Sequence, residues 1–147
     1  MRKFMVVKGF EDRGVVLPVR STAYSAGYDF MTLEEVTILP GSSVLIQTGV
    51  KAQMEKDDVL LIFPRSSLAV KRGLRLTNSV AVIDADYFSN PSNDGHIMIP
   101  LYNFSAKSVT LLKGERVAQG IFMKYEITDD DKAQGERIGG YGSTGTK

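Results

Sequence analysis

The fold of this chain is decided by the stretch His96-Ile97-Met98-Ile99-Pro100-Leu101-Tyr102-Asn103-Phe104. In an extended chain, successive side chains point to opposite faces. The aliphatic residues of the stretch therefore share one face and its other large residues share the second: Ile97, Ile99 and Leu101 against Met98, Tyr102 and Phe104. This alternation predicts a β-strand. Because both faces carry large apolar groups, we expect both to be covered.

Similar segments recur along most of the chain. They are short, rich in Val, Ile, Leu and Phe, and separated by turn residues such as Pro40-Gly41 and Lys113-Gly114, which is typical of strands. We place strands at Phe4–Lys8, Val15–Val19, Val36–Leu39, Val44–Val50, Val59–Phe63, Arg75–Val82, His96–Phe104, Ser108–Leu112 and Val117–Tyr125. Many short strands with turns between them predict an all-β fold: a sandwich, a jelly roll or a small barrel.

One short helix is expected, from Ser66 to Arg72. Ser66 or Ser67 would supply the capping hydroxyl at its start. Gly73 would end it, because glycine adopts the left-handed backbone conformation without a steric penalty.

The chain is expected to form one domain followed by an arm. It has 147 residues, of which 43% are apolar, enough for a single core. We assign residues 1–127 to a β-barrel domain and residues 128–147 to a C-terminal arm. The arm opens with Asp129-Asp130-Asp131 and ends, from Ile138 to Lys147, in a run dominated by Gly, Ser and Thr. That composition predicts a flexible segment.

Charge and composition exclude several classes of function. Eighteen basic and seventeen acidic residues leave a net charge of +1, so no global field gathers nucleic acid or an anionic membrane. The chain has no cysteine and one histidine, which excludes a thiolate zinc site but leaves a hard cation on carboxylates open. The longest apolar run, Val59–Phe63, is too short to span a membrane, and no signal peptide is evident. We expect a cytoplasmic protein.

The first stretch with chemical promise is Pro64–Ala69, where a strand ends and Arg65, Ser66 and Ser67 precede the expected helix. Helical N–H groups, two hydroxyls and a guanidinium would converge there, which suits a phosphate. An ordinary serine cap explains the two hydroxyls equally well.

The second stretch is Asn78–Tyr87, in which four apolar residues lead to Asp84 at a strand end. A carboxylate in that position could act as a general base, although Asp84 and Asp86 also fit plain turn chemistry. A third stretch, Ala26–Asp29, reads as a small-residue turn carrying one carboxylate.

The fourth stretch is the glycine-rich tail Arg137–Gly145. Its glycines would let backbone amides approach a phosphate closely, but disorder explains the same composition. It is not a Walker A loop, because Gly145 is followed by Thr146-Lys147 rather than by Lys and a hydroxyl residue.

Taken together and in order, these stretches resemble the five motifs of the trimeric, all-β dUTP diphosphatase family. The matching segments are Ala26–Phe30, Pro64–Ala69, Asn78–Tyr87, Gly114–Phe122 and Arg137–Gly145. Val-Ile-Asp-x-Asp-Tyr combined with Gly-Gly-Tyr-Gly-Ser-Thr-Gly is the specific part of the match, whereas Arg-Ser-Ser is shared more widely. The resemblance implies a distorted jelly-roll barrel that hydrolyses dUTP to dUMP and pyrophosphate with Mg²⁺.

The resemblance also implies roles for the residues that bind phosphate. Asp84 would deprotonate the water that attacks the α-phosphorus. The triphosphate would be held by Mg²⁺ and four side chains: Arg65, Ser66, Ser67 and Gln119. Asp29 would orient waters on a Mg²⁺ ion that is held mainly by the substrate phosphates.

The base and sugar are assigned to other positions by the same resemblance. Asn78, Ile83 and the neighbouring main chain would read the uracil edge, with no room for a 5-methyl group, and Tyr87 would exclude a 2′-hydroxyl. The arm would close over a neighbouring subunit's active site in a homotrimer, using Arg137 on the γ-phosphate, Tyr141 on the uracil, and the backbone around Gly142 and Ser143.

Two features depart from the family pattern. Phe88–Gly95 is an apparent insertion after Tyr87, whose role the sequence leaves open. Tyr141 stands where phenylalanine is commoner, and Ile138 replaces a usual glycine, which leaves the closure geometry of the arm open.

The sequence argues against three other functions. A dCTP deaminase resembles this chain around Arg65 and Asp84, but it needs a glutamate on the strand after the third motif, and His96–Asn103 contains none. A zinc-dependent deaminase is excluded by the lack of cysteine. A β-barrel binding or regulatory protein without turnover is disfavoured by the presence of Asp84.

Overall fold

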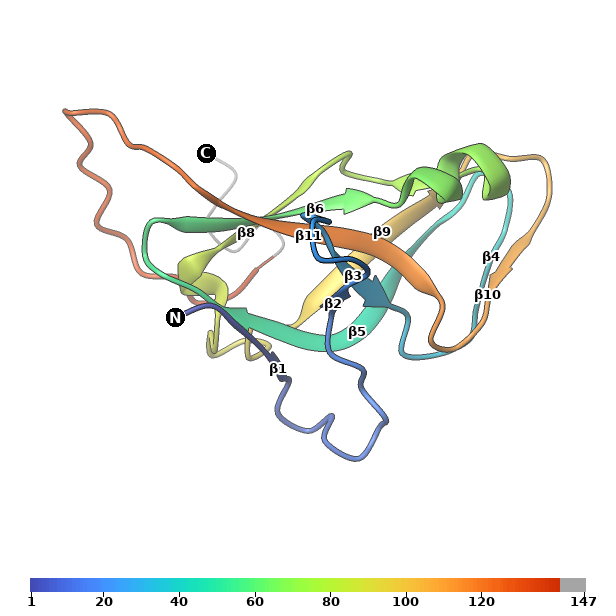
Figure 1. Cartoon of the computed structure of the whole chain (residues 1–147), viewed down its shortest axis with the longest axis horizontal. Coiled ribbons are helices and arrows are strands. Elements are labelled where there is room, and N and C mark those ends of the chain that lie inside the picture. The colour runs from blue at the N-terminus through green and yellow to red at the C-terminus, as the bar shows by residue number, and fades with distance from the viewer. Residues whose placement is uncertain (141–147) are drawn as a thin grey trace.

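The computed structural model describes residues 1–140 and is nearly all β (Figure 1). Its strands are β1 (Lys3–Val6), β2 (Val19–Arg20), β3 (Tyr28–Met31), β4 (Val36–Ile38), β5 (Ser43–Gln53), β6 (Asp58–Pro64), β7 (Leu74–Leu76), β8 (Ala81–Asp84), β9 (Ile97–Asn103), β10 (Val109–Leu111) and β11 (Arg116–Lys124). Two short helical turns complete the elements, η1 (Leu68–Arg72) and η2 (Ala85–Tyr87). The predicted all-β class with one short helical segment before Gly73 is confirmed.

The strands form three antiparallel sheets. One runs in the order β1-β5-β9-β7, a second in the order β2-β3-β11-β6-β8, and a small third sheet pairs β10 with β4. The first two sheets pack as layers of a distorted jelly roll, with β6, β8 and β11 in one layer and β1 and β5 in the other (Figure 1).

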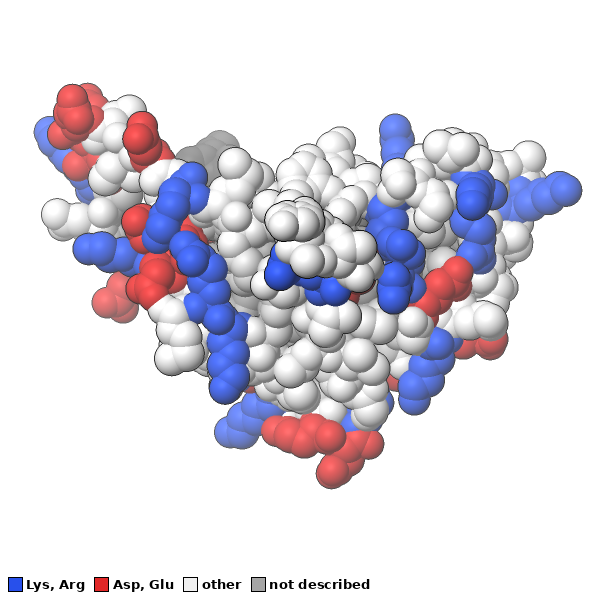
Figure 2. Space-filling model, viewed as in Figure 1, with Lys and Arg blue, Asp and Glu red and all other residues white. Residues whose placement is uncertain are grey.

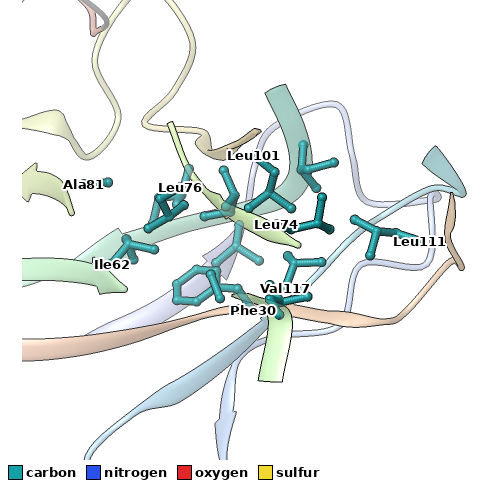
Figure 3. Close-up of a cluster of buried hydrophobic side chains, with 14 of the residues drawn as sticks. Phe30, Ile62, Leu74, Leu76, Ala81, Leu101, Leu111 and Val117 are labelled. Carbon is teal, nitrogen blue, oxygen red and sulfur yellow. The ribbon is translucent and has the colours of Figure 1, made fainter. Parts of the chain in front are cut away.

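The core lies between these layers (Figure 3). It is built from inward-facing aliphatic and aromatic side chains, among them Phe30, Ile62, Leu74, Leu101 and Val117, each at most 1% exposed. Burial of one such large side chain contributes roughly 1.5–3 kcal/mol relative to leaving it in water. The core therefore holds the two sheets, and the site residues at their edges, in fixed relative positions.

The strand predicted over His96–Phe104 forms as β9. Ile97, Ile99 and Leu101 are fully buried in β9, and β9 lies between β5 and β7. Its second face, with Met98 and Tyr102, is only half-buried in the single chain. The two faces are thus covered to different degrees.

Three of the predicted elements differ from the structure. The segment from Tyr28 onward is strand β3, not part of a turn, because it pairs with both β2 and β11. The single strand expected over Arg75–Val82 is divided into β7 and β8, which belong to different sheets. Ser79 between them has a left-handed φ of 66°, which interrupts an extended chain. Of Val15–Val19, only the last residue is in a strand.

The expected helix is present as a short turn. Ser66 and Ser67 are helical and lead into η1, which has π-helical geometry. Gly73 ends it in the left-handed conformation, with φ 65°. The expected hydroxyl cap does not form at Ser67, which caps the turn without a side-chain hydrogen bond.

Residues 125–140 follow β11 without entering any helix or strand and return towards η2 (Figure 1). On the face shown in Figure 2, basic and acidic side chains are interspersed towards both ends, while the centre is largely uncharged. An anion therefore meets local charges rather than a broad basic field on this face. Within residues 1–140, no helix is long and apolar enough to cross a bilayer.

Candidate active site

A pocket of about 190 Å³ lies beside β8, at the edge of the five-stranded sheet. Its walls come from the β7–β8 connection, β8, η2, β9 and the arm: Asn78, Ala81, Val82, Ile83, Asp84, Tyr87, Met98, Pro100, Arg137 and Gly140. This volume is below the roughly 300–1,000 Å³ of a site for a drug-sized molecule. The pocket suits one small ring system, with any longer group extending out of its mouth.

The edge position of β8 gives the pocket polar main-chain groups. Among residues 1–140, β8 pairs with β6 alone, so its other edge keeps N–H and C=O groups that no strand uses. Beside this edge, Asn78 and Ser79 form a tight turn in which Val80 N donates to Asn78 O over 2.8 Å. A planar ligand with donors and acceptors along one edge can pair with such a strand.

Asp84 is the last residue of β8, and its side chain is 50% exposed at the pocket mouth. Arg137 from the arm donates through Nη2 to Asp84 Oδ2 over 2.5 Å and through Nε to Asp86 Oδ1 over 2.7 Å. The carboxylate therefore faces both the pocket and solvent, where it can reach a water molecule.

Tyr87 closes the inner side of the pocket and is only 5% exposed. Its hydroxyl donates to His96 O over 2.6 Å. The arm approaches the ring so closely that a Cβ on Gly140 would lie 2.5 Å from Tyr87 Cε2. Only glycine fits at that position in the observed arrangement.

The structure thus gathers one group of the sequence-predicted site residues around a single pocket: Asn78, Ile83, Asp84, Tyr87 and Arg137. Tyr141, Gly142 and Ser143 lie outside the described residues.

A second group gathers on the neighbouring strands of the same sheet. Gln119 on β11 lies opposite Asp29 on β3 and opposite Phe63 on β6. Arg65, just beyond β6, places its Nε 3.5 Å from Asp29 Oδ1, and Gln119 Nε2 donates to Pro64 O over 3.3 Å. Ser66 is exposed and Ser67 half-buried at the helical turn that follows. These predicted phosphate-binding residues therefore share one region.

Two residues of this region were not predicted from the sequence. Arg116 Nη1 lies 3.5 Å from Asp29 Oδ2, and Ser21 Oγ donates to the same oxygen over 2.8 Å. Two guanidinium groups thus face one carboxylate, which leaves local positive charge for an anion. Arg116 stands in the Gly114–Phe122 motif, three residues before Gln119, and could have been found there. Nothing in the sequence around Ser21 pointed to it.

The two groups lie at opposite ends of the β6–β8 pair. Asp84 is opposite Val59 near the start of β6, whereas Arg65 follows the end of that strand. At about 3.3 Å per residue, the run from Val59 to Arg65 spans roughly 20 Å. Groups that act on one phosphate must lie within hydrogen-bond reach of it. Within a single chain, Asp84 and Arg65 are therefore too far apart to act on the same phosphate.

Asp29 is the residue that the sequence relates to a metal. It is 6% exposed and shared between Arg65, Arg116 and Ser21. Among the described residues, no three carboxylate or histidine side chains converge on a point. A single carboxylate is compatible only with an Mg²⁺ ion that keeps most of its waters and binds mainly phosphate oxygens.

Comparison with known proteins shows which family this chain resembles in sequence. The family model described as dUTPase matches residues 13–145. A relative named deoxyuridine 5′-triphosphate nucleotidohydrolase, from Lactococcus lactis subsp. lactis, is 48% identical over 99% of this chain and 98% of its own. A protein of the same name from Corynebacterium diphtheriae is 38% identical over 91% of this chain and 88% of its own.

Solved structures show the same likeness. The crystal structure of dUTPase from Streptococcus mutans superposes with a TM-score of 0.81 at 45% identity, covering 86% of this chain and 98% of that one. A Staphylococcus bacteriophage 80alpha dUTPase, in a mutant form with dUpNHpp, has a TM-score of 0.73 at 20% identity and covers 99% of both chains. The second likeness concerns the fold alone.

Proposed function

This chain belongs to the dUTPase family and hydrolyses dUTP to dUMP and pyrophosphate, and we propose that Asp84 is the general base of this reaction. The position of Asp84 supports the role: it ends β8, lines the pocket and keeps half of its side chain exposed. It would take a proton from the water that attacks the α-phosphorus. Cleavage of the bond between the α-phosphorus and its bridging oxygen then releases pyrophosphate and leaves dUMP.

We further propose that each active site is assembled from different copies of the chain in a homotrimer. The single observation behind this proposal is the separation of roughly 20 Å between Asp84 and Arg65 along β6. Both residues are assigned to one triphosphate, so we place the pocket of one copy beside the Arg65 region of another. The described part of the chain carries both residues, at opposite ends of the β6–β8 pair.

In such a site, the triphosphate would lie across the region of Arg65, Ser66, Ser67 and Gln119. The transfer of a phosphoryl group depends mainly on positioning and charge neutralisation. Arg116 adds a further guanidinium beside Arg65 and belongs with these residues. Mg²⁺ would supply additional positive charge to the phosphates, with Asp29 orienting its waters.

The pocket itself would take the nucleoside. The free edge of β8, with Ile83, and the side chain of Asn78 offer hydrogen-bond groups to the uracil edge. Tyr87 forms the wall against the sugar, where a 2′-hydroxyl would need space. In the single chain Arg137 contacts its own Asp84. In the trimer the arm would instead close a neighbouring subunit's site, where Arg137 would bind the γ-phosphate.

The test compares Asp84→Asn with Asp86→Asn, because both carboxylates contact Arg137 but only Asp84 lines the pocket beside β8. Pyrophosphate release from dUTP should fall by about 10²–10⁴-fold in kcat for Asp84→Asn. The Asp86→Asn variant, which keeps the base, should retain most of its kcat. Equal losses in the two variants, or near-normal turnover by Asp84→Asn, would refute the assignment of the base.

A further inference from the structure

The inserted segment Phe88–Gly95 folds into a compact, hydrogen-bonded loop. Asn90 Oδ1 accepts hydrogen bonds from the backbone N–H groups of Ser92 and Asn93, over 3.0 and 3.1 Å. Asn93 Oδ1 accepts from Gly95 N over 3.1 Å and from Asn90 Nδ2 over 2.8 Å. The two asparagine side chains therefore fix each other and the loop backbone, so the insertion has a defined shape.

The inserted loop holds Tyr87 at its backbone oxygen and at its hydroxyl. Asn90 Nδ2 donates to the Tyr87 backbone oxygen over 2.8 Å, and Asn93 Nδ2 donates to the Tyr87 hydroxyl over 2.8 Å. The same hydroxyl donates to His96 O over 2.6 Å. A phenolic hydroxyl has one hydrogen to donate. The Tyr87 hydroxyl donates this hydrogen to His96 O and accepts a hydrogen bond from Asn93. These two bonds fix the position of the ring.

The far side of the insertion is anchored independently of Tyr87. Asp94 Oδ2 accepts from Lys8 N over 2.8 Å and from Lys51 Nζ over 2.6 Å. The Lys51 ammonium also lies 5.1 Å from the centre of the Phe88 ring. Burial raises the pKa of Asp94, but the hydrogen bonds from Lys51 and Lys8 outweigh it, and the net pKa lies below the usual value. Asp94 therefore anchors the loop as a carboxylate.

We propose that Asn93 is a positioning residue for sugar selection, which acts by holding the ring of Tyr87 rigidly against the pocket. This inference rests on the proposed role of Tyr87 as the wall that excludes a 2′-hydroxyl. Steric exclusion discriminates only if the wall does not move aside, since a small displacement admits the larger substrate. At the ring itself, the insertion supplies that rigidity through the Asn93 amide.

The test measures kcat/KM for dUTP and for UTP with Asn93→Ala, Tyr87→Phe and the double variant. Loss of one such hydrogen bond should raise the UTP/dUTP ratio by about 3- to 10-fold. Because Asn93→Ala and Tyr87→Phe remove opposite ends of the same contact, the double variant should show the ratio of Tyr87→Phe alone. If Asn93 acted only on loop stability, the effects of Asn93→Ala and Tyr87→Phe on the UTP/dUTP ratio would add in the double variant.

Asp94→Asn is the matched control. It weakens the anchor to Lys51 without touching the Asn93–Tyr87 contact, so it should lower the melting temperature and leave the UTP/dUTP ratio unchanged. A ratio that rises as much in Asp94→Asn as in Asn93→Ala would overturn the specific role of Asn93.

Tyr87→Ile separates this inference from the function on which it rests. If Tyr87→Ile raises the UTP/dUTP ratio but Asn93→Ala does not, the positioning role is wrong and the sugar wall stands. If Tyr87→Ile leaves the ratio unchanged, the assignment of Tyr87 to the sugar is wrong, and the inference about Asn93 falls with it.

Discussion

Arg137 and Asp84 are joined by a 2.5 Å contact between guanidinium Nη2 and carboxylate Oδ2, although 53 positions separate them in the chain. The side chain of Arg137 is only 15% exposed, whereas that of Asp84 is 50% exposed. The arm therefore places its cation on the carboxylate that we assign as the base. A triphosphate carries more negative charge than this carboxylate, so bound nucleotide should draw the guanidinium away from Asp84.

Removal of the arm tests this exchange. A chain that ends at Gly135 lacks Arg137 but keeps every strand found within residues 1–140, so its melting temperature and oligomeric state should match the full-length chain. Its kcat should fall by orders of magnitude together with a rise in KM, because the proposed closure of the arm would exclude water and align the phosphates. Steady-state kinetics and thermal melting are the measurements. Full-length turnover by the shortened chain would show that the arm is dispensable, and failure to fold would show that it is structural.

Mixing of variants tests the shared site. Chains carrying Asp84→Asn and chains carrying Arg65→Ala should each be nearly inactive as homotrimers. Mixed trimers should regain activity, because some sites then combine an intact Asp84 from one copy with an intact Arg65 from another. The measurement is dUTP hydrolysis after co-refolding of the two variants, with light scattering to confirm about three times 16.1 kDa. Inactivity of purified mixed trimers would mean that both residues serve one site within the same chain.

Two glycine substitutions should separate stability from activity. A Cβ on Gly120 would lie 2.8 Å from Phe30 Cε2 and 3.0 Å from Leu60 Cδ1, inside the core. Gly120→Ala should therefore lower the free energy of unfolding by about 1–3 kcal/mol. A Cβ on Gly27 would lie 2.4 Å from Gln119 Oε1, so Gly27→Ala should displace the Gln119 amide at a smaller cost in stability.

Gly27→Ala should consequently raise KM for dUTP or lower kcat, while its melting temperature stays above that of Gly120→Ala. Thermal melting and kinetics of both variants provide the comparison. An unchanged kcat/KM in Gly27→Ala would remove the support for Gln119 as a phosphate-binding residue.

The buried His96 should make the stability of the fold sensitive to acid. Burial, aided by the positive charge of Arg13, lowers the pKa of His96 from 6.5 to about 4. The neutral ring accepts a hydrogen bond from Gly49 N over 2.9 Å and packs against Phe10. Between these two pH values the unfolded chain binds a proton that the folded chain does not. Stability from this group is therefore complete above about pH 6.5 and declines as the pH falls, with no further loss below about pH 4.

The total loss should not exceed about 3.5 kcal/mol, since one pKa unit corresponds to about 1.4 kcal/mol. Urea unfolding of the wild type and of His96→Gln between pH 4 and pH 7 measures it. The glutamine variant keeps a side-chain acceptor but does not titrate, so its stability should change less over this range. Parallel curves for the two proteins would contradict the role of His96.

The sequence by itself determined the class of fold and the position of Asp84 at a strand end. Alternation such as that of Ile97, Ile99 and Leu101 is a local property, because neighbouring side chains of an extended chain point to opposite faces whatever the strand later pairs with. The apolar run before Asp84 likewise predicts a strand that delivers a carboxylate to its end. Gly73 ended the helical turn as expected, since a left-handed residue is a local requirement.

Only the tertiary structure decided which strands pair and what the insertion contacts. The division of Arg75–Val82 between two sheets, and the position of Gln119 opposite Asp29, depend on contacts between segments far apart in the chain. The contacts of Arg116 with Asp29 and of Asn93 with the Tyr87 hydroxyl appear only when sheets and loops close. Register and loop closure are set by the packing of the whole core, which no short window of sequence contains.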